Sequence, residues 1–508
     1  MSRDARDATA ARGVASFYAD LHADPAALRV CRGTSCWLAG GDTVWRRRSQ
    51  EGACRGAYCL GWCDRSPALL RPDGRVATGE RAREGDAADA PDARPDVRSL
   101  AREPIVTARI ARGSFAALDV ARGDGAYAAL ARALAGPRES VLDAVERSGQ
   151  RGRGGSAFPT AAKWRDCAAT SAPSRVAIAN GDEGDPGSFL DRVLMEDDPH
   201  ALLEGLLLCA FAIGAQEGIV YIRSEYPRAQ QRVRDAIAQA RAANLAGPRI
   251  LGSGFSCELS VVSGHGSYVC GEETALLNSI EGRRGEVRLR PPYPSERGLH
   301  GMPTVVNNVE TLACVPAIVA RGGAWYAARG TPACAGTIGL CLNAGFARPG
   351  IVEVDFGTPL SAVLADAGGA AGGGVLDAVL LGGPMGSVVL PRDFDAPVDY
   401  DAMSARGLRL GHGGLVALPR GADVRGLLLH GLAFMRDESC GRCAPCRLGS
   451  ARAHALIATQ PGAAPRDALL RLLDVMEQAS LCGFGQLVPG PLRELATHFR
   501  AGVFGEGA

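Results

Sequence analysis

The periodicity of apolar and polar positions differs between successive parts of the chain. Between residues 101 and 334, short apolar runs typical of buried strands alternate with segments of helical periodicity. This alternation is characteristic of an α/β domain. The pattern predicts strands at 176–179 and 218–222, and helices at 140–147, 201–213, 228–243 and 274–280.

The segments on either side of this region have other patterns of apolar and polar residues. Residues 335–412 contain short β runs around one helix, which predicts a small α+β module, and residues 413–508 return to helical periodicity, which predicts a helical bundle. Residues 1–80 form a Cys-rich unit, and the polar stretch 81–100 is predicted to be a linker. Strands are predicted at 28–30, 69–71, 75–77, 337–342, 350–354 and 378–381, and helices at 360–367, 424–436, 450–459, 465–479 and 490–499.

Composition narrows the class of protein. The 508 residues include 56 Lys+Arg and 55 Asp+Glu, so no basic field that would attract nucleic acid is expected. The longest apolar run, 205–215, is too short to span a bilayer. The first residues, MSRDARDATAARG, lack the apolar core of a secretory signal. We therefore expect a cytoplasmic, globular protein without a membrane span of its own.

Sixteen cysteines in such a chain are not expected to form disulfides. Two dense sets, one at each end, indicate metal sites, and the scattered cysteines between them are predicted to be buried apolar side chains. In the C-terminal set, C-x2-C-x2-C is followed by a distant fourth cysteine, which suits a [4Fe-4S] cluster. The alternative is zinc, although four-cysteine zinc sites more often use two separated pairs. The predicted ligands are Cys440, Cys443, Cys446 and Cys482.

A loop rich in Gly and Arg, GQRGRGGSAFPT at 149–160, is a candidate phosphate-binding loop. It formally fits the dinucleotide fingerprint, but the segment before it is predicted to be a helix, which argues against an ordinary Rossmann start. A flexible surface loop is the alternative for this segment.

Three further segments are rich in polar groups. NGDEGDPG at 180–187 follows a predicted strand, where side chains commonly face a ligand crevice; a calcium loop or a solvated acidic turn are the alternatives. YVCGEET at 268–274 places two carboxylates at a helix N-terminus, where the macrodipole alone would favour them. The asparagine pair in PTVVNNVET at 303–311 suits ribityl hydroxyls or phosphate, but could equally cap a helix.

Taken in order, these segments resemble the flavoprotein subunit of respiratory complex I, the 51 kDa-type NADH dehydrogenase subunit. The same module occurs in soluble NAD-dependent formate dehydrogenases and NAD-reducing hydrogenases. The resemblance covers roughly residues 100–508 and rests on GRGGSAFPT, NGDEGDPGSF, DRVLMEDDPH, YVCGEETAL, PTVVNNVETL, ESCGRCAPCR and SLCGFG. It implies a Rossmann-like FMN domain, a β-grasp module of the soluble-ligand-binding type and a helical bundle with [4Fe-4S].

The resemblance also implies site residues. Phe158, Glu273 and Tyr293 would line the NADH site, with Tyr293 where the family often has Phe. Asp166 stands where an aromatic residue is common, so one wall of that site is expected to lack its aromatic ring. No side chain is expected to act as a nucleophile, and Glu272 and Glu273 would act electrostatically. The residues implied to hold FMN are Gly152, Arg153, Gly154, Lys163, Asn180, Asp182, Glu183, Tyr268, Gly271, Glu272, Asn307 and Asn308.

The N-terminal unit resembles the cluster-bearing half of a thioredoxin-like [2Fe-2S] ferredoxin. The implied ligands Cys31, Cys36, Cys59 and Cys63 have that family's paired spacings, but only 22 residues separate the pairs. Cys54 offers an alternative C-x4-C with Cys59. Zinc and an empty, vestigial site are the alternatives to [2Fe-2S].

The resulting hypothesis is a diaphorase subunit that transfers hydride between NAD(H) and FMN and then passes single electrons through [4Fe-4S]. The extra N-terminal unit favours a soluble NAD-dependent formate dehydrogenase; a complex I subunit and a hydrogenase diaphorase are the alternatives. A flavin-free electron wire and a zinc scaffold are the competing hypotheses. Expected partners are a thioredoxin-like [2Fe-2S] subunit and a catalytic subunit, which could bring the protein to the inner face of a membrane. The choice between NAD and NADP stays open.

Overall fold

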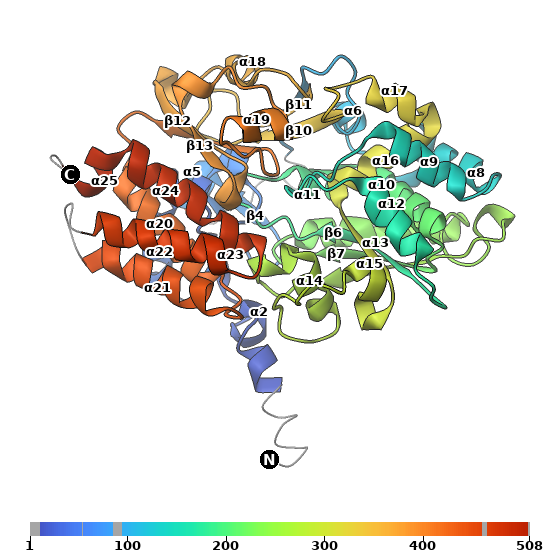
Figure 1. Ribbon diagram of the computed structural model, residues 1–508, viewed down its shortest axis with the longest axis horizontal. Coiled ribbons are helices and arrows are strands. Elements are labelled where there is room, and N and C mark those ends of the chain that lie inside the picture. The colour runs from blue at the N-terminus through green and yellow to red at the C-terminus, as the bar shows by residue number, and fades with distance from the viewer. Residues whose placement is uncertain (1–10, 53, 85–93, 460–464, 506–508) are drawn as a thin grey trace, which may run out of the picture.

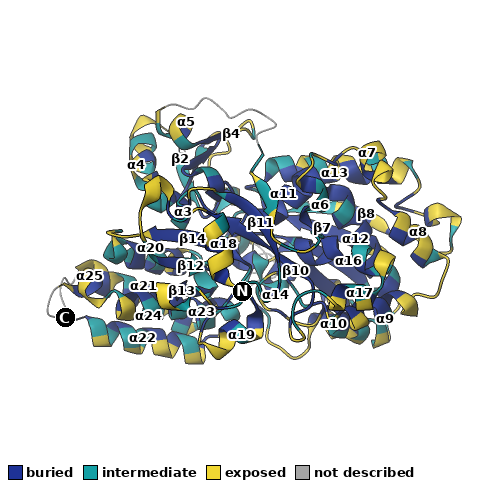
Figure 2. Ribbon diagram, turned by 90° about the horizontal axis from the view of Figure 1, so that it is seen from above, coloured by how far each residue is buried: buried dark blue, intermediate teal, exposed yellow. Residues whose placement is uncertain are grey.

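The computed structural model describes residues 11–52, 54–84, 94–459 and 465–505. An N-terminal unit, an α/β domain, a module built on a mixed sheet and a helical bundle pack against one another (Figure 1). The sheets lie in the buried interior, and the exposed residues gather on the outer faces of the helices (Figure 2). The start of the charged N-terminal segment and the middle of the predicted linker lie outside the described residues.

The α/β domain is built on a four-stranded parallel sheet with the order β8-β7-β6-β9. Successive side chains of β6 enter two different cores: Ala177 and Ala179 pack on one face, and Val176 and Ile178 on the other. Burial on both faces is typical of parallel sheets and accounts for the nearly continuous apolar run. The strands are β6 (Val176–Gly181), β7 (Glu217–Ile222), β8 (Glu258–Ser263) and β9 (Thr304–Asn308).

The predicted strands and helices of this domain are present, with helix starts displaced by one or two residues. Strands β8 and β9 were not predicted, because each contains only a short apolar stretch between polar residues. The helices are α6 (Thr107–Ile110), α7 (Leu118–Gly123), α8 (Ala128–Leu134), α9 (Glu139–Ser148), α10 (Thr160–Ala169), α11 (Leu190–Asp197), α12 (Pro199–Ile213), α13 (Pro227–Ala242), α14 (Glu273–Ile280), α15 (Pro294–Arg297), α16 (Val309–Arg321) and α17 (Gly323–Ala327).

The second module contains a six-stranded mixed sheet with the order β13-β12-β14-β10-β11-β5. Two of its strands lie outside the expected range 335–412: β5 comes from the predicted linker, and β14 from the segment assigned to the bundle. Both are added by long-range pairing that local periodicity does not reveal. The elements are β5 (Val97–Ser99), β10 (Thr337–Leu342), β11 (Gly350–Asp355), α18 (Leu360–Asp366), β12 (Leu376–Leu381), β13 (Ser387–Val389), α19 (Tyr400–Ala405) and β14 (Gly414–Pro419).

The C-terminal segment is helical, as predicted, and packs around its own apolar core of Leu, Met and Phe side chains. None of the helices in the described ranges is both long enough and apolar enough to cross a membrane. The helices are α20 (Val424–Asp437), α21 (Ala444–Thr459), α22 (Arg466–Ala479), α23 (Gly483–Leu487), α24 (Pro489–His498) and α25 (Arg500–Phe504).

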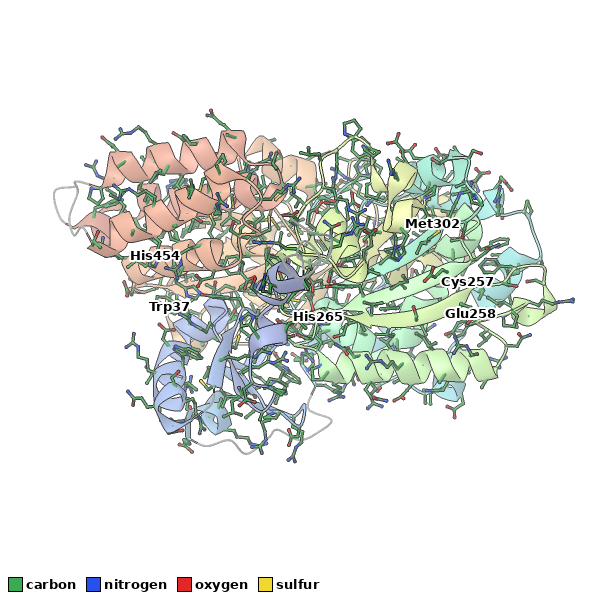
Figure 3. All side chains as sticks on the ribbon, turned by 90° about the horizontal axis from the view of Figure 1, so that it is seen from below. Trp37, Cys257, Glu258, His265, Met302 and His454 are labelled. Atoms are coloured by element: carbon green, nitrogen blue, oxygen red, sulfur yellow. The ribbon has the colours of Figure 1, made fainter. Side chains whose placement is uncertain are left out.

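The N-terminal unit contacts the three other units rather than standing apart. Trp37 stacks on His430 of the bundle with ring centroids 5.2 Å apart, and Figure 3 shows the unit beside the bundle. Arg223 of the α/β domain donates to the Tyr58 carbonyl at 2.9 Å. The unit has the sheet order β2-β1-β3-β4. Helix α5 extends into the predicted linker. The elements are α2 (Ala19–His22), β1 (Leu28–Cys31), α3 (Thr34–Leu38), α4 (Gly41–Glu51), β2 (Cys54–Ala57), β3 (Ala68–Leu70), β4 (Val76–Thr78) and α5 (Gly79–Glu84).

Candidate functional site

The predicted FMN residues meet at the carboxyl edge of the parallel sheet. The register of β6 and β9 pairs Asn180 with Asn308, so both amides stand side by side where the strands end. Asn180 Nδ2 donates to the Gly271 carbonyl at 2.9 Å, which ties the segment before α14 to the same edge. Carboxyl ends of parallel strands are the usual position of a ligand crevice in open α/β sheets.

The glycine-rich loop lies over this edge and follows helix α9, as predicted. A Cβ added at Gly154 would lie 3.2 Å from Asn308 Cβ, so the loop backbone comes close to the asparagine pair. The Arg153 backbone N–H donates to Thr311 Oγ1 at 2.9 Å, which holds the loop on the first turn of α16. Gly at this position therefore permits a close approach of two backbones at the crevice.

Charged groups at the crevice are paired with one another. Lys163 Nζ lies 3.0 Å from Glu273 Oε2 and donates to the Val306 carbonyl, also at 3.0 Å. Arg290 contacts Glu272 and lies 3.1 Å from Glu273 Oε1. Two cations at the carboxyl edge of the sheet are suited to the phosphates of FMN or of a dinucleotide.

One carboxylate oxygen at the crevice has no partner. Asp182 Oδ2 is buried and accepts no hydrogen bond from the described residues. Burial raises the pKa of the Asp182 carboxyl well above its ordinary value. An orphaned buried acceptor is costly, and the hydroxyls of a ribityl chain are donors that would satisfy it. The residues present therefore fit a flavin.

Two aromatic rings are left open beside the crevice. The side chains of Phe158 and Tyr293 are 49% and 52% exposed, which is unusual for rings of this size. Exposed rings are suited to stacking on the bases of NADH. Asp166 is exposed on α10 and supplies no third ring.

The C-terminal cysteines form a second candidate centre. Cys440 and Cys443 lie in the loop between α20 and α21, Cys446 in the first turn of α21, and Cys482 at the start of α23. The pKa of Cys446 is raised to about 12, chiefly by burial and also by the neighbouring thiols of Cys443, Cys482 and Cys440. Arg284 Nη2 donates to the Cys440 carbonyl at 3.0 Å, which holds this loop on the α/β domain. The four cysteines therefore lie close enough to interact electrostatically, and their role as cluster ligands stays a prediction.

Two family models match this chain. Residues 145–317 match the Nuo51 FMN-binding domain, and residues 427–504 match the NADH-ubiquinone oxidoreductase-F iron-sulfur binding region. The NADP-reducing hydrogenase subunit HndC of Solidesulfovibrio fructosivorans is 40% identical over 371 residues, covering 72% of this chain and 76% of that protein. The chain belongs to the 51 kDa-type NADH dehydrogenase flavoprotein family.

Other members of this flavoprotein family align similarly. The second F-type NADH-quinone oxidoreductase subunit of Rhizobium meliloti (strain 1021) is 40% identical over 349 residues, covering 68% of this chain and 83% of that protein. A crystal structure of NAD+-reducing [NiFe]-hydrogenase in the H2-reduced state contains a chain with a TM-score of 0.83 and 31% identity, which covers 97% of this chain and 87% of that one. The protein is thus an oxidoreductase of the NADH dehydrogenase type, with FMN, [4Fe-4S] and NAD(H) as its cofactors and substrate.

Within the crevice of this NADH dehydrogenase flavoprotein, two predicted FMN ligands have side chains committed elsewhere. The Arg153 guanidinium is 1% exposed and donates to the Thr337 carbonyl at 3.1 Å and to Tyr326 Oη at 2.8 Å. Glu183 accepts from the backbone N–H groups of Asp191 and Arg192 at 3.0 Å each, so it caps α11. Direct contacts of these two side chains with FMN are not supported, because their hydrogen-bonding groups already serve the fold.

Three other predicted ligands have structural bonds in addition. Glu272 accepts from the N–H groups of Thr274 and Ala275 and caps α14, so its carboxylate stabilises the N-terminus of this helix. Asn308 caps α16, and Asn307 Oδ1 accepts from Trp164 Nε1 at 2.8 Å. These bonds fix the orientation of the three side chains at the carboxyl edge of the sheet.

Tyr268 connects the crevice with the cluster-binding bundle. Its hydroxyl donates to Asp185, and its ring packs edge-on to Phe434 at 5.0 Å and beside Phe484 at 5.6 Å. The pKa of Tyr268 is raised well above its ordinary value by burial and by the Asp185 carboxylate. The hydroxyl therefore stays protonated and acts as a donor.

The N-terminal cysteines are brought together by the unit that precedes the two matched flavoprotein regions. Cys31, Cys36, Cys59 and Cys63 are each 1% exposed, and the sulfur atoms of Cys59 and Cys63 lie 3.4 Å apart. Cys54 lies apart from them, with Sγ 3.5 Å from Ser49 Oγ, so the alternative C-x4-C pairing is not supported.

Backbone N–H groups point at three of these sulfurs. Leu60 N–H approaches Cys31 Sγ at 3.5 Å, Gly61 N–H approaches Cys59 Sγ at 3.2 Å, and Gly187 N–H approaches Cys63 Sγ at 3.3 Å. Hydrogen bonds to sulfur stabilise thiolate charge and tune cluster potentials. Among the described residues, no three His, Cys, Asp or Glu side chains converge tightly enough to surround a single metal ion.

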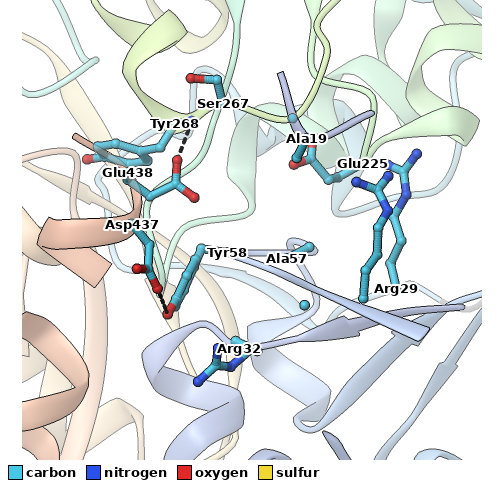
Figure 4. Close-up of a pocket in the computed structure, with 13 residues that line it drawn as sticks. Ala19, Arg29, Arg32, Ala57, Tyr58, Glu225, Ser267, Tyr268, Asp437 and Glu438 are labelled. Atoms are coloured by element: carbon cyan, nitrogen blue, oxygen red, sulfur yellow. Dashed lines mark hydrogen bonds between the residues drawn. The ribbon is translucent and has the colours of Figure 1, made fainter. Parts of the chain in front are cut away.

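A cavity of about 240 Å³ lies where the N-terminal unit, the α/β domain and the bundle meet (Figure 4). Tyr268 is the member of the predicted nucleotide site that lines it. Its basic wall is neutralised, because Asp20 contacts Arg55 and lies 3.3 Å from Arg29. The opposite wall carries carboxylates, so the cavity has no excess charge that would select an ionic ligand. The lining residues are Ala19, Arg29, Arg32, Arg55, Gly56, Ala57, Tyr58, Glu225, Gly266, Ser267, Tyr268, Asp437 and Glu438.

Proposed function

We propose that this chain is the diaphorase subunit of a soluble, hydrogenase-type NAD-linked complex. The observation that carries the proposal is the extent of the structural match. It covers 97% of this chain in the NAD+-reducing [NiFe]-hydrogenase, so the N-terminal Cys-rich unit is included. By sequence alone the two kinds of relative are not separated, because the hydrogenase subunit HndC covers 72% of this chain and the Rhizobium meliloti F-type subunit covers 68%.

A formate dehydrogenase is the function that the sequence favoured, and a complex I subunit is the other alternative. The relatives described above carry hydrogenase and NADH-quinone oxidoreductase names, which supports these two assignments over formate. Partner identity separates the three, because the diaphorase chemistry is common to all of them. We place the protein in the cytoplasm, with any membrane contact made through partner subunits.

In the proposed crevice, each residue has a physical task. Asn180, Asn308 and Asp182 offer amide and carboxylate groups to the ribityl chain, and Lys163 offers a cation to the phosphate. Phe158 and Tyr293 stack on the dinucleotide, and Glu273 holds Lys163 in place. FMN, when bound, supplies the step between two-electron hydride chemistry and single-electron transfer.

We also propose that Cys31, Cys36, Cys59 and Cys63 hold a [2Fe-2S] cluster. Their clustering and the N–H groups directed at three of the sulfurs support a charged iron–sulfur centre over a vestigial site. Iron and sulfide analysis of wild type and Cys59→Ser tests this, with Cys54→Ser as the matched control. We expect Cys59→Ser to lose about two irons per chain. Equal iron in both variants, or zinc at the site, would refute it.

The main experiment is anaerobic purification of the native complex. We expect stoichiometric FMN, NADH:ferricyanide turnover, and hydrogen-dependent NAD+ reduction with a nickel–iron partner identified by mass spectrometry. Formate-dependent reduction with a molybdenum-containing partner would restore the formate assignment, and membrane partners would indicate complex I. Iron without flavin would support an electron wire, and zinc without iron a scaffold.

A further inference from the structure

His412 faces the nucleotide crevice from the six-stranded sheet. It lies directly before β14, and its Nε2 is 3.6 Å from Asp185 Oδ2 in the loop after β6. The two side chains are only 10% and 18% exposed. This imidazole and carboxylate belong to different modules, so only the packing of the modules brings them together.

The hydrogen bond on the other side of the ring orients the imidazole. Gly414 N–H donates to His412 Nδ1 at 3.2 Å, so Nδ1 is an acceptor. In the neutral ring the proton is therefore on Nε2, directed toward Asp185. Nε2 is buried and makes no direct hydrogen bond to the described residues. The 3.6 Å separation is thus an electrostatic contact that becomes an ion pair when the ring is protonated.

Glycines leave room for the ring. A Cβ at Gly383 would lie 2.5 Å from His412 Nε2, and a Cβ at Gly414 would lie 2.7 Å from Cε1. A Cβ at Gly155, in the glycine-rich loop, would lie 3.6 Å from the His412 backbone N. The imidazole therefore fills the space left beside Gly383 and Gly414, and the His412 backbone lies next to the glycine-rich loop.

Asp185 connects His412 with Tyr268, a residue of the proposed nucleotide site. Its Oδ1 accepts from the Tyr268 hydroxyl, and Tyr268 packs on Phe434 and Phe484 of the cluster-binding bundle. The other titratable groups near the Asp185 and Tyr268 pair are Asp182 and Glu438, both of which interact electrostatically with Tyr268. Arg223 interacts electrostatically with both Asp182 and Glu438, and His412 is the imidazole that faces Asp185.

We propose that His412 is a positioning residue for the nicotinamide reaction: it holds the Asp185 carboxylate in the orientation that accepts from Tyr268. The proposal rests on the proposed nucleotide crevice. The Nε2 side of the imidazole is turned toward Asp185 Oδ2, so the contact restrains the loop after β6 on which Asp185 lies.

The test compares His412→Gln with His498→Gln in the flavin-loaded protein, since His498 is exposed on α24. FMN content, and KM and kcat for NADH with ferricyanide, are measured between pH 6 and 9. We expect His412→Gln to retain FMN and to raise KM for NADH by about fivefold while kcat changes little. His498→Gln should behave as wild type. A wild-type KM in His412→Gln would overturn the proposal.

A second measurement needs no flavin. Thermal unfolding of the flavin-free protein at pH 6 is compared for Asp185→Asn, His412→Gln and the double variant. We expect the loss of Tm in the double variant to be smaller than the sum of the single losses, because the pair is broken only once. Additive losses would refute the contact. A wild type without FMN or NADH oxidation would defeat the proposed function, while this cycle would still decide the pair.

Discussion

Gly184→Ala is the sharpest steric probe of the crevice. Gly184 lies between Glu183, which caps α11, and Asp185, which accepts from Tyr268. A Cβ at this position would lie 2.7 Å from Tyr268 Cδ2 and 3.3 Å from Cε2. The Gly184 backbone is not in the left-handed region, so the substitution tests only the space beside the ring.

The ring cannot move without breaking other contacts. Tyr268 is held by the Asp185 carboxylate at its hydroxyl and by Phe434 and Phe484 on the bundle side. Inserting a methyl group into such packing costs about 1–3 kcal/mol. If the whole cost reduces the free energy of FMN binding, FMN affinity falls by roughly 5- to 150-fold.

The assay is reconstitution of flavin-free protein with FMN, followed by fluorescence quenching and by thermal unfolding. Gly123→Ala is the matched control, because a Cβ there meets no atom within 4 Å. We expect Gly184→Ala to bind FMN more weakly and Gly123→Ala to bind it normally. Unchanged FMN affinity and unchanged Tm in Gly184→Ala would refute the packing argument at this ring.

Three further predictions concern burial and charge. Phe158→Ala should raise KM for NADH by roughly three- to tenfold without loss of FMN, because it removes a stacking ring; Val120→Ala, at a similarly exposed residue, should leave KM unchanged. Glu353→Gln should lower the free energy of unfolding by about 1–3 kcal/mol in urea titrations, since Oε2 accepts from the Thr107 N–H at 2.9 Å and an amide NH₂ cannot. Burial raises the pKa of Glu310 to about 8, so the folded protein retains a proton that the unfolded chain loses near pH 4.5. Stability should therefore fall as the pH rises between these values, and Glu310→Gln should reduce that fall; an identical pH dependence in the variant would exclude Glu310 as its source.

Local patterns predicted strands β6 and β7, the bundle helices and the position of one iron–sulfur region. The apolar runs of β6 and β7 and the periodicity of the bundle helices follow from burial on one or both faces. The spacing of Cys440, Cys443 and Cys446 places three thiols on one loop and helix start, and the structure adds Cys482 to them. Patterns of this kind are visible because the interacting residues lie within a few positions of one another.

Other features depended on contacts between distant segments. Strands β5 and β14 join the six-stranded sheet by pairing with neighbours far away in the chain. Arg153 resembles a phosphate ligand in the sequence, yet its guanidinium donates to the Tyr326 hydroxyl and to the Thr337 carbonyl of β10. A sequence motif shows which hydrogen-bond donors are present, whereas the tertiary packing decides which acceptors lie within reach of them.

The sequence by itself determined the family, the order of the modules and the residue types at the crevice and the two cysteine sets. Only the tertiary structure decided that Cys54 stays apart from its neighbours, that Glu183 serves as a helix cap, and that His412 faces Asp185. The physical reason is range: hydrophobic periodicity and ligand spacing act over one or two turns, whereas hydrogen bonds and charge contacts depend on which surfaces meet when the modules pack.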